Sequence, residues 1–280
     1  LVSYGAALQT GAGLGRRDPA TGQRAPKPEH DCQDRLLFDP SRGMGIIADG
    51  VGGEGGGAMA ASIVTNAFYQ DISREKLSRV VNPPAAANAL SDSLHAADRT
   101  LGAAKQFLTE AYEGAAAAAT AFQLLPGGKL AFVHAGDTSL FISDETGECE
   151  QITDDQCLNG NRNIITNFLD GNRMTESKDS VRHHDQLGIV QLKPGRNIIT
   201  LTTDGYTGDA EHERMDMIDI EAAHLELQAQ GLDLDHPQAG RIIAEYMAQN
   251  RLKKRDDVGI LVVVVNVEPN LDNTADLPTK

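Results

Sequence analysis

Residues 43–62, GMGIIADGVGGEGGGAMAAS, contain the features on which the predicted fold depends. A short apolar run at residues 46–48 predicts a strand that leads into Asp49, and six of the next eight residues are glycine. Apolar residues at helical spacing follow at once and predict a helix that begins near Ala58. A carboxylate at a strand end that faces open backbone suits a hard cation, but a glycine-rich turn in which Asp49 caps the helix fits equally well.

The composition limits the classes of protein to which the chain can belong. Its 280 residues predict a single domain, with a core at about 32–267, a long loop at 10–31 and a frayed tail at 268–280. The 40 Asp and Glu residues outnumber the 25 Lys and Arg residues. The resulting formal net charge of -15 argues against nucleic-acid and anionic-membrane partners and favours cation binding.

The cysteines and the hydropathy indicate the compartment. Cys32, Cys149 and Cys157 lack the spacing of a zinc site or a disulfide framework, so they are interpreted as ordinary thiols in a reducing compartment. No apolar run reaches the roughly 18 residues that a membrane span needs. We expect a cytoplasmic protein without a membrane partner, and a monomer.

A hairpin is predicted just before the glycine-rich stretch. Two short apolar runs, at residues 35–38 and 44–48, are joined by the turn sequence DPSRG. In an antiparallel pair, the start of one strand and the end of the other lie at the same edge. This pairing places Asp34 beside Asp49.

The same pattern recurs in the second half of the chain. The β-branched run at residues 197–203 ends on Asp204, which is followed by Gly205. Asp257 opens the most apolar strand of the chain, at residues 260–265. If these two strands pair antiparallel, Asp204 and Asp257 share an edge.

The remaining segments carry weaker patterns. Asp137 is predicted to lie inside a strand pair, where an aspartate is more often a hydrogen-bonded structural residue than a ligand. His134 lies on the strand before it and is interpreted as a satisfied core residue. The polar segment 151–186 has no assigned elements. Helices are predicted at 84–112, 211–230 and 236–252, and strands at 115–124, 130–135 and 139–143.

Together the sequence predicts a cluster of carboxylates. Four aspartates lie at strand edges and a fifth lies inside a strand pair: Asp34, Asp49, Asp204, Asp257 and Asp137. Without a counter-charge they would repel one another by several kcal/mol at low effective dielectric, which implies a bound cation. Oxygen ligands without paired His or Cys favour Mg²⁺ or Mn²⁺ over zinc. The adjacent His183 and His184 are unsuited to binding one cation together.

The order of these motifs resembles that of the metal-dependent protein phosphatases, the type 2C serine/threonine family, and its bacterial members in particular. The resemblance runs in order from about Cys32 to Val267. It rests on six short motifs that are weak singly but specific in series: CQDRLLF, ADGVGGEGGGAMAAS, AFVHAGDTSLFI, ITDDQ, LTTDG and RDDVGILVV.

The resemblance implies an α+β fold, a four-layer α-β-β-α sandwich of two stacked antiparallel sheets with the metal site at one sheet edge. Two Mn²⁺ or Mg²⁺ ions are implied, with a weaker third. Asp49 would bridge the two ions, and Asp34 would act directly or through water; these two are the implied catalytic residues. The other implied metal ligands are the Gly50 carbonyl, Asp204 and Asp257, with Asp137 at the third ion.

The implied activity is hydrolysis of phosphoserine and phosphothreonine in a protein substrate by a metal-activated water, in opposition to a serine/threonine kinase. One alternative is a pseudophosphatase, a binding module with the same fold and no turnover. Five retained aspartates argue against that alternative, because an inactive site has no reason to tolerate their repulsion. A regulator that dephosphorylates one small acidic partner would use the same chemistry.

The chain departs from the family pattern at several positions. Val51 replaces the histidine that eukaryotic relatives use as a candidate general acid, and bacterial relatives often have Met there. Gly259 stands where the closing motif usually has Thr, and Thr138-Ser139 replaces Ser-Arg after Asp137. The expected partner of the third ion falls on Gly208, with Asp209 one step further on.

The clearest departure concerns the phosphate. The family places an arginine five residues before the aspartate that matches Asp34, where a guanidinium can hold a phosphate with two hydrogen bonds. Here that position is Glu29, which would repel a phosphate. The preceding loop could bring back Arg24 or Lys27, and we predict Arg24 as the substrate-binding residue because of its fork geometry. Otherwise the metals alone bind the phosphate.

Overall fold

The computed structural model describes residues 1, 3–9, 14–17, 24–26, 32–51, 56–73, 82–107, 114–158, 161–171, 185–207, 215–250 and 257–269. Its helices are α1 (Gly56–Ser73), α2 (Pro83–Lys105), α3 (Asp204–Thr207), α4 (Met215–Ala229) and α5 (Ala239–Asn250). Its strands are β1 (Ser3–Gln9), β2 (Leu14–Arg17), β3 (Arg24–Pro26), β4 (Arg35–Asp39), β5 (Met44–Val51), β6 (Ala116–Leu125), β7 (Lys129–Ala135), β8 (Ser139–Asp144), β9 (Cys149–Gln151), β10 (Cys157–Leu158), β11 (Asn161–Ile165), β12 (Gln186–Gln191), β13 (Gly195–Thr202) and β14 (Val258–Val267).

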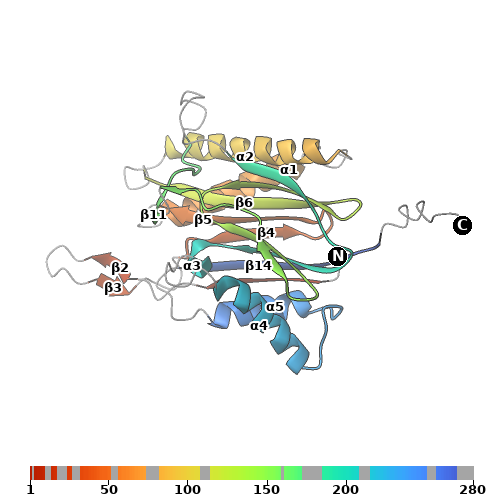
Figure 1. The fold of residues 1–280 in the computed structure, drawn as a ribbon. Coiled ribbons are helices and arrows are strands. Elements are labelled where there is room, and N and C mark those ends of the chain that lie inside the picture. The colour runs from red at the N-terminus through yellow and green to blue at the C-terminus, as the bar shows by residue number, and fades with distance from the viewer. Residues whose placement is uncertain are drawn as a thin grey trace, which may run out of the picture.

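Two five-stranded antiparallel sheets form the centre of the fold (Figure 1). Sheet I has the strand order β1-β14-β13-β8-β9, and sheet II has the order β12-β7-β6-β5-β4. The sheets stack, with α1 and α2 covering sheet II and α4 and α5 covering sheet I. The predicted four-layer α-β-β-α sandwich is therefore confirmed.

Three apolar clusters separate these four layers. The cluster between the sheets includes Ile47, Phe122, Leu201 and Leu261. One outer cluster lies between sheet II and its helices, and the other lies between sheet I and its helices. Because β5 and β14 bury both faces, their apolar residues form nearly continuous runs, which is why these strands were clear in the sequence.

Both predicted strand pairs at the aspartates are confirmed. Strand β4 pairs antiparallel with β5, and Arg35 lies opposite Ala48. Strand β13 pairs antiparallel with β14, and Thr202 lies opposite Ile260. Helix α1 follows the glycine-rich stretch as predicted. Helix α2 begins with its two prolines and ends at Lys105, earlier than the predicted residue 112; residues 108–113 lie outside the described part.

Two expectations need correction. Residues 10–31 were expected to be a loop, but they contain the two-stranded sheet of β2 and β3, which projects from the sandwich in Figure 1. This pair has few apolar residues and no alternating pattern, so it carries little sequence signal. The unassigned segment 151–186 contains the small sheet of β10 and β11, and β12 begins at its end. Of the expected tail, residues 268–269 are described and the rest is not.

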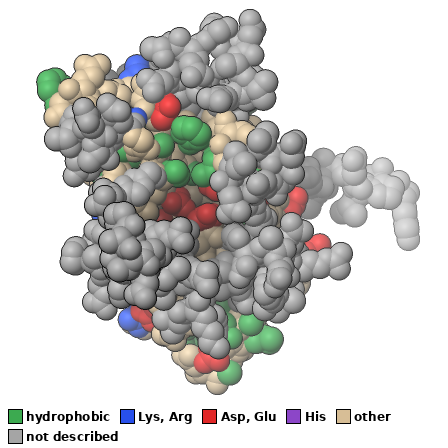
Figure 2. Space-filling model, turned by 90° about the vertical axis from the view of Figure 1, so that its left-hand side faces the viewer, with side chains coloured by type: hydrophobic (Ala, Val, Ile, Leu, Met, Phe, Trp, Pro, Cys, Tyr) green, Lys and Arg blue, Asp and Glu red, His purple; other side chains and the backbone are tan. Residues whose placement is uncertain are grey.

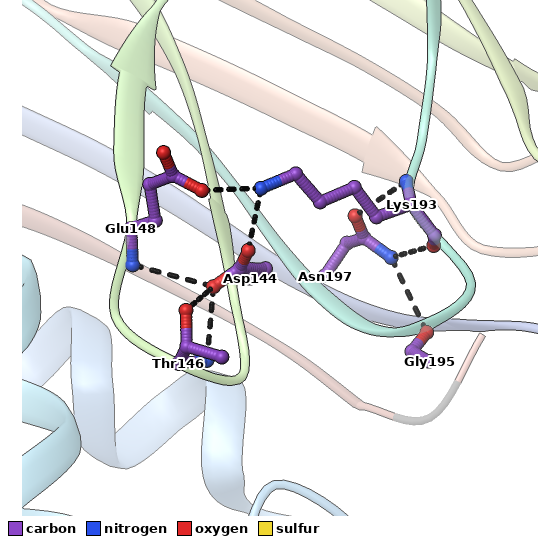
Figure 3. A network of polar contacts seen from close by, with 6 residues as sticks. All are labelled: Asp144, Thr146, Glu148, Lys193, Gly195 and Asn197. Carbon is purple, nitrogen blue, oxygen red and sulfur yellow. Dashed lines mark hydrogen bonds and ion pairs between the residues drawn. The ribbon is translucent and has the colours of Figure 1, made fainter.

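A polar network joins two turns at one end of sheet I (Figure 3). Lys193 Nζ lies 2.7 Å from Asp144 Oδ2 and 2.5 Å from Glu148 Oε2. Burial opposes ionisation of Asp144, but hydrogen bonds from Lys193 and Thr146 outweigh it and lower the pKa of Asp144 to about 2. Asn197 lies in the same network and accepts a hydrogen bond from the Lys193 amide. The network therefore fixes the start of β13, and the candidate site lies where β13 ends.

None of the helices in the described ranges combines the length and apolar character that a bilayer crossing requires. The three cysteines are free thiols, as predicted.

Candidate metal centre

The five predicted aspartates lie at one end of the sandwich. Asp34 precedes β4 and Asp49 lies in β5, so both belong to the same edge of sheet II. Asp204 follows β13 and Asp257 precedes β14, at the matching edge of sheet I. Asp137 connects β7 of sheet II with β8 of sheet I. Figure 2 shows this end of the molecule, where acidic side chains gather in a hollow beside hydrophobic ones.

Strand alternation sets the direction in which the two sheet II aspartates project. Ile47 belongs to the cluster between the sheets, and Asp49 follows it by two residues, so both face sheet I. Asp34 lies two residues before Leu36, which also packs between the sheets, so the two side chains face the same side. The carboxylates of sheet II therefore point toward those of sheet I.

The convergence of these carboxylates affects the pKa of Asp49. The residue keeps some exposed surface, but its carboxyl is surrounded by protein atoms. This burial, followed by the charges of Asp204, Asp34 and Asp137, raises the pKa of Asp49 well above its usual value. An ionised carboxylate surrounded by like charges is unfavourable unless a proton or a cation neutralises it.

Asp34 is held by a buried threonine from the other sheet. Thr203 Oγ1 donates a hydrogen bond to Asp34 Oδ2 at 2.8 Å, and the Gly259 amide donates to Thr203 Oγ1 at 2.8 Å. All three residues are buried. These two hydrogen bonds therefore connect Thr203 and Gly259, on the side of sheet I, to Asp34, which directly precedes β4 of sheet II.

A second hydrogen bond also connects the two sheets. The backbone amide of Gln33 donates to Asp257 Oδ2 at 2.6 Å, so Asp257 also spans from sheet I to the start of β4. The neighbouring Cys32 has its pKa raised to about 11, first by burial and then by the charge of Asp34. Its thiol is therefore protonated near neutral pH, which agrees with its interpretation as an ordinary thiol.

The glycines of the two Asp-Gly pairs permit close backbone packing. A Cβ at Gly50 would lie 2.1 Å from the carbonyl oxygen of Gly57, at the start of α1. A Cβ at Gly205 would lie 1.6 Å from the carbonyl oxygen of Asp257. Each glycine thus lets a neighbouring segment pack directly against an aspartate.

Arg35 holds the segment that carries Asp34, and the sequence analysis missed it. Its Nη1 donates to the carbonyl oxygens of Cys32 and Asp34, each at 2.7 Å, and its Nε donates to Ser62 Oγ at 2.9 Å. Ser62 lies in α1, so this guanidinium connects the start of β4 to the helix after the glycine-rich stretch. Its position next to Asp34, a predicted ligand, was the available signal.

His134 is a core residue, as predicted. Its ring nitrogens lie 2.8 Å from Thr120 Oγ1 and 3.1 Å from the Asp154 carbonyl oxygen, and burial lowers its pKa to about 4. Thr120 Oγ1 also lies 2.6 Å from Thr138 Oγ1, next to Asp137.

Other predicted residues are described in part or not at all. Arg24 lies in β3, where its backbone pairs with that of Arg17, and its side chain is not described. Val51 is exposed at the end of β5. Six predicted positions lie outside the described residues: Lys27, Glu29, His183, His184, Gly208 and Asp209.

The donors at this edge suit a hard divalent cation. They are carboxylates, and the pKa of Asp49 is raised by burial and then by the negative charges around it. Within the described ranges, no group of three or more His, Cys, Asp and Glu side chains is already spaced as a complete set of metal ligands. The carboxylates of the described edge supply suitable ligand chemistry for such a cation.

The comparisons with solved structures agree with this fold. The chain superposes on the Mycobacterium tuberculosis serine/threonine phosphatase PstP/Ppp with a TM-score of 0.66 and 20% identity, covering 95% of this chain and 98% of that chain. The PstP catalytic domain in complex with two manganese ions gives 0.63 and 21%, covering 94% and 98%. PppA, a regulatory component of the type VI secretion system in Pseudomonas aeruginosa, gives 0.63 and 17%, covering 94% and 97%.

At these identities the superpositions establish the fold alone. A comparison with curated proteins gave no significant match. The sequence model of the family described as protein phosphatase 2C matches residues 21–237, which is more than half of the chain and includes Asp34, Asp49, Asp137 and Asp204. The chain therefore belongs to the protein phosphatase 2C family, and its fold is that of the bacterial serine/threonine phosphatases.

Proposed function

We propose that this protein is a Mg²⁺- or Mn²⁺-dependent phosphatase that hydrolyses phosphoserine and phosphothreonine in proteins. The observation that carries the proposal is the convergence of four carboxylates: burial, followed by the charges of Asp204, Asp34 and Asp137, raises the pKa of Asp49. Membership of the protein phosphatase 2C family supports the reaction class. The manganese complex of PstP supports the kind of cation.

The proposed ligands follow from the positions of the carboxylates. Asp49 would bind both of two ions, because it interacts with aspartates of both sheets and of their connection. The Gly50 carbonyl, Asp204 and Asp257 would complete these two sites, with Asp34 directly or through water. Asp137 would hold a weaker third ion. When bound, such cations lower the pKa of a coordinated water and polarise the phosphate.

The other residues of the site would hold this arrangement in place. Arg35 and the Gln33 amide fix the segment around Asp34, and Thr203 fixes its carboxylate. In the reaction a water oxygen adds to phosphorus and the serine or threonine oxygen leaves with a proton. The proposed step uses neither the thiol of Cys32, whose pKa is raised to about 11, nor the buried His134, whose pKa is lowered to about 4.

Arg24 is the proposed phosphate-binding residue, because Glu29 occupies the position where the resemblance requires an arginine. The substrate would be a phosphoprotein in a system that also contains a serine/threonine kinase, and the protein would act as a monomer in the cytoplasm.

The test is hydrolysis of an aryl phosphate and of phosphoserine, phosphothreonine and phosphotyrosine peptides, with Mn²⁺, with Mg²⁺ and with EDTA. We expect turnover only with a divalent cation and only with phosphoserine and phosphothreonine among the peptides. Asp49→Asn serves as the inactive control. Tight Mn²⁺ binding without turnover on any substrate would instead indicate a binding module with this fold.

A further inference from the structure

Thr203 is a buried residue with a hydroxyl in a defined chain of two hydrogen bonds. It follows the last residue of β13, and none of its surface is exposed. The Gly259 amide can only donate, so the Thr203 oxygen accepts from it at 2.8 Å. The hydroxyl proton is then directed at Asp34 Oδ2, which also lies at 2.8 Å. The direction of both bonds is set by the chemistry of the groups.

These two hydrogen bonds connect one sheet to the other. Thr203 directly follows β13 and Gly259 lies in β14, both strands of sheet I, whereas Asp34 directly precedes β4 of sheet II. The bond lies in a buried environment, and a hydrogen bond to an ionised carboxylate is roughly twice as strong as a neutral one. Thr203 therefore restrains Asp34 from the opposite layer.

The absence of a side chain at Gly259 leaves room for this contact. A Cβ at Gly259 would lie 3.1 Å from Ile47 Cδ1, 3.2 Å from Thr203 Cγ2 and 3.3 Å from Asp34 Oδ2. Any side chain at this position would press on both partners of the hydrogen bond. Glycine in place of the usual threonine of the closing motif thus has a local structural reason.

We propose that Thr203 is a positioning residue for metal binding, which holds the Asp34 carboxylate beside Asp49 and is itself oriented by the Gly259 amide. This inference rests on the proposed function, since it assigns Asp34 to a cation. Groups that orient metal ligands commonly change metal affinity by 10- to 100-fold when they are removed. Thr203 would act in this way without touching the substrate.

The test compares Mn²⁺ affinity in Thr203→Val, Thr203→Ser and the wild type, by Mn²⁺ titration followed by electron paramagnetic resonance. Valine keeps the shape and removes the hydroxyl, and serine keeps the hydroxyl. We expect Thr203→Val to bind Mn²⁺ about tenfold or more weakly and Thr203→Ser to stay close to the wild type. Thr200→Val is the matched control, because this buried hydroxyl on the same strand has no hydrogen-bond partner among the described residues.

Equal Mn²⁺ affinity in all of these proteins would overturn the positioning role, whatever their turnover. A wild type that binds Mn²⁺ and hydrolyses no phosphoester would overturn the proposed function, while the Thr203 comparison would still decide the positioning role. If Thr203→Val does not fold, Gly259→Ala replaces it. It keeps both hydrogen-bonding groups and adds a methyl against them, so weaker Mn²⁺ binding supports the proposal and unchanged binding overturns it.

Discussion

Gly205 packs directly against the carbonyl oxygen of Asp257, so closely that a Cβ at position 205 would lie 1.6 Å from that oxygen. The two residues belong to the segments that follow β13 and precede β14, each of which carries a proposed ligand. The contact sets the separation of Asp204 and Asp257. Any larger residue at 205 would push the two segments apart.

We therefore expect Gly205→Ala to destabilise the protein by roughly 1 to 3 kcal/mol, as overpacking typically does. It should also weaken Mn²⁺ binding, because the two aspartates separate. Urea unfolding and Mn²⁺ titration measure both effects. Gly114→Ala is the matched control, since nothing lies within 4 Å of a Cβ at that position. A Gly205→Ala protein with wild-type stability would contradict the close packing.

Asp49→Asn should have opposite effects with and without metal. Without metal, the substitution removes one of several mutually repelling charges, so the variant should melt above the wild type, by roughly 2 to 4 °C for each kcal/mol of repulsion relieved. With saturating Mn²⁺, the wild type should gain about 2.7 kcal/mol at 100 times its Kd, whereas the variant should gain little. Turnover should be lost.

Thermal unfolding of the wild type and of Asp49→Asn, each with and without Mn²⁺, measures both predicted changes in melting temperature. Asp92→Asn, at an exposed position on α2, controls for the loss of one negative charge. An Asp49→Asn variant with wild-type rates at saturating Mn²⁺ would exclude a mechanism with two bridged ions.

Asp137→Ala tests the proposed third ion. Asp137 is buried between β7 and β8, and its charge is among those that raise the pKa of Asp49. We expect the variant to show lower activity across a Mn²⁺ titration while the two tighter sites still fill. Asp92→Ala is again the charge control. Unchanged activity at every Mn²⁺ concentration would remove Asp137 from the mechanism.

The sequence was sufficient to predict much of the fold because several strands carry strong local signals. The hairpin of β4 and β5 has two apolar runs around a turn, and its register brings Asp34 to Asp49. The β-branched β13 and the apolar β14 gave the second pair, with Asp204 and Asp257 at its edge.

The contacts that organise the site could not be predicted in the same way. Thr203 and Asp34 are 169 residues apart, and nothing local to either one indicates their hydrogen bond. Arg35 was overlooked because its guanidinium bonds mainly to backbone carbonyls, so that only its position next to Asp34 could have pointed to it. Gly50 was interpreted as open backbone for a cation, whereas the structure adds a packing requirement against Gly57.

His134 should make stability depend on pH. Burial lowers its pKa to about 4, from an ordinary value of 6.5. Between these values the unfolded chain binds a proton that the folded chain does not, so stability falls as the pH drops from about 6.5 to about 4. The loss from this residue is on the order of 3 kcal/mol. His134→Gln should remove this part of the dependence, as measured by urea unfolding at a series of pH values. The same pH dependence in both proteins would show that the imidazole is not kept neutral by the fold.

The final prediction concerns how the substrate phosphate is bound. Glu29 stands at the position where the resemblance requires an arginine, and a carboxylate there would repel a phosphate dianion. Arg35 is close to Asp34 but donates to two backbone carbonyls and to Ser62, so it is committed to holding its own segment. Arg24 on β3 is the proposed replacement.

Steady-state kinetics of Arg24→Ala separate the two possibilities for the phosphate. If Arg24 binds it, KM should rise tenfold or more, equivalent to about 1.4 kcal/mol, with little change in kcat. Arg17→Ala is the matched control, because Arg17 is the cross-strand partner of Arg24 in the same hairpin and should leave KM unchanged. Arg35→Ala should instead lower kcat and Mn²⁺ affinity, since it disturbs the segment that carries Asp34. Wild-type KM and kcat in Arg24→Ala would leave the metals as the phosphate anchor.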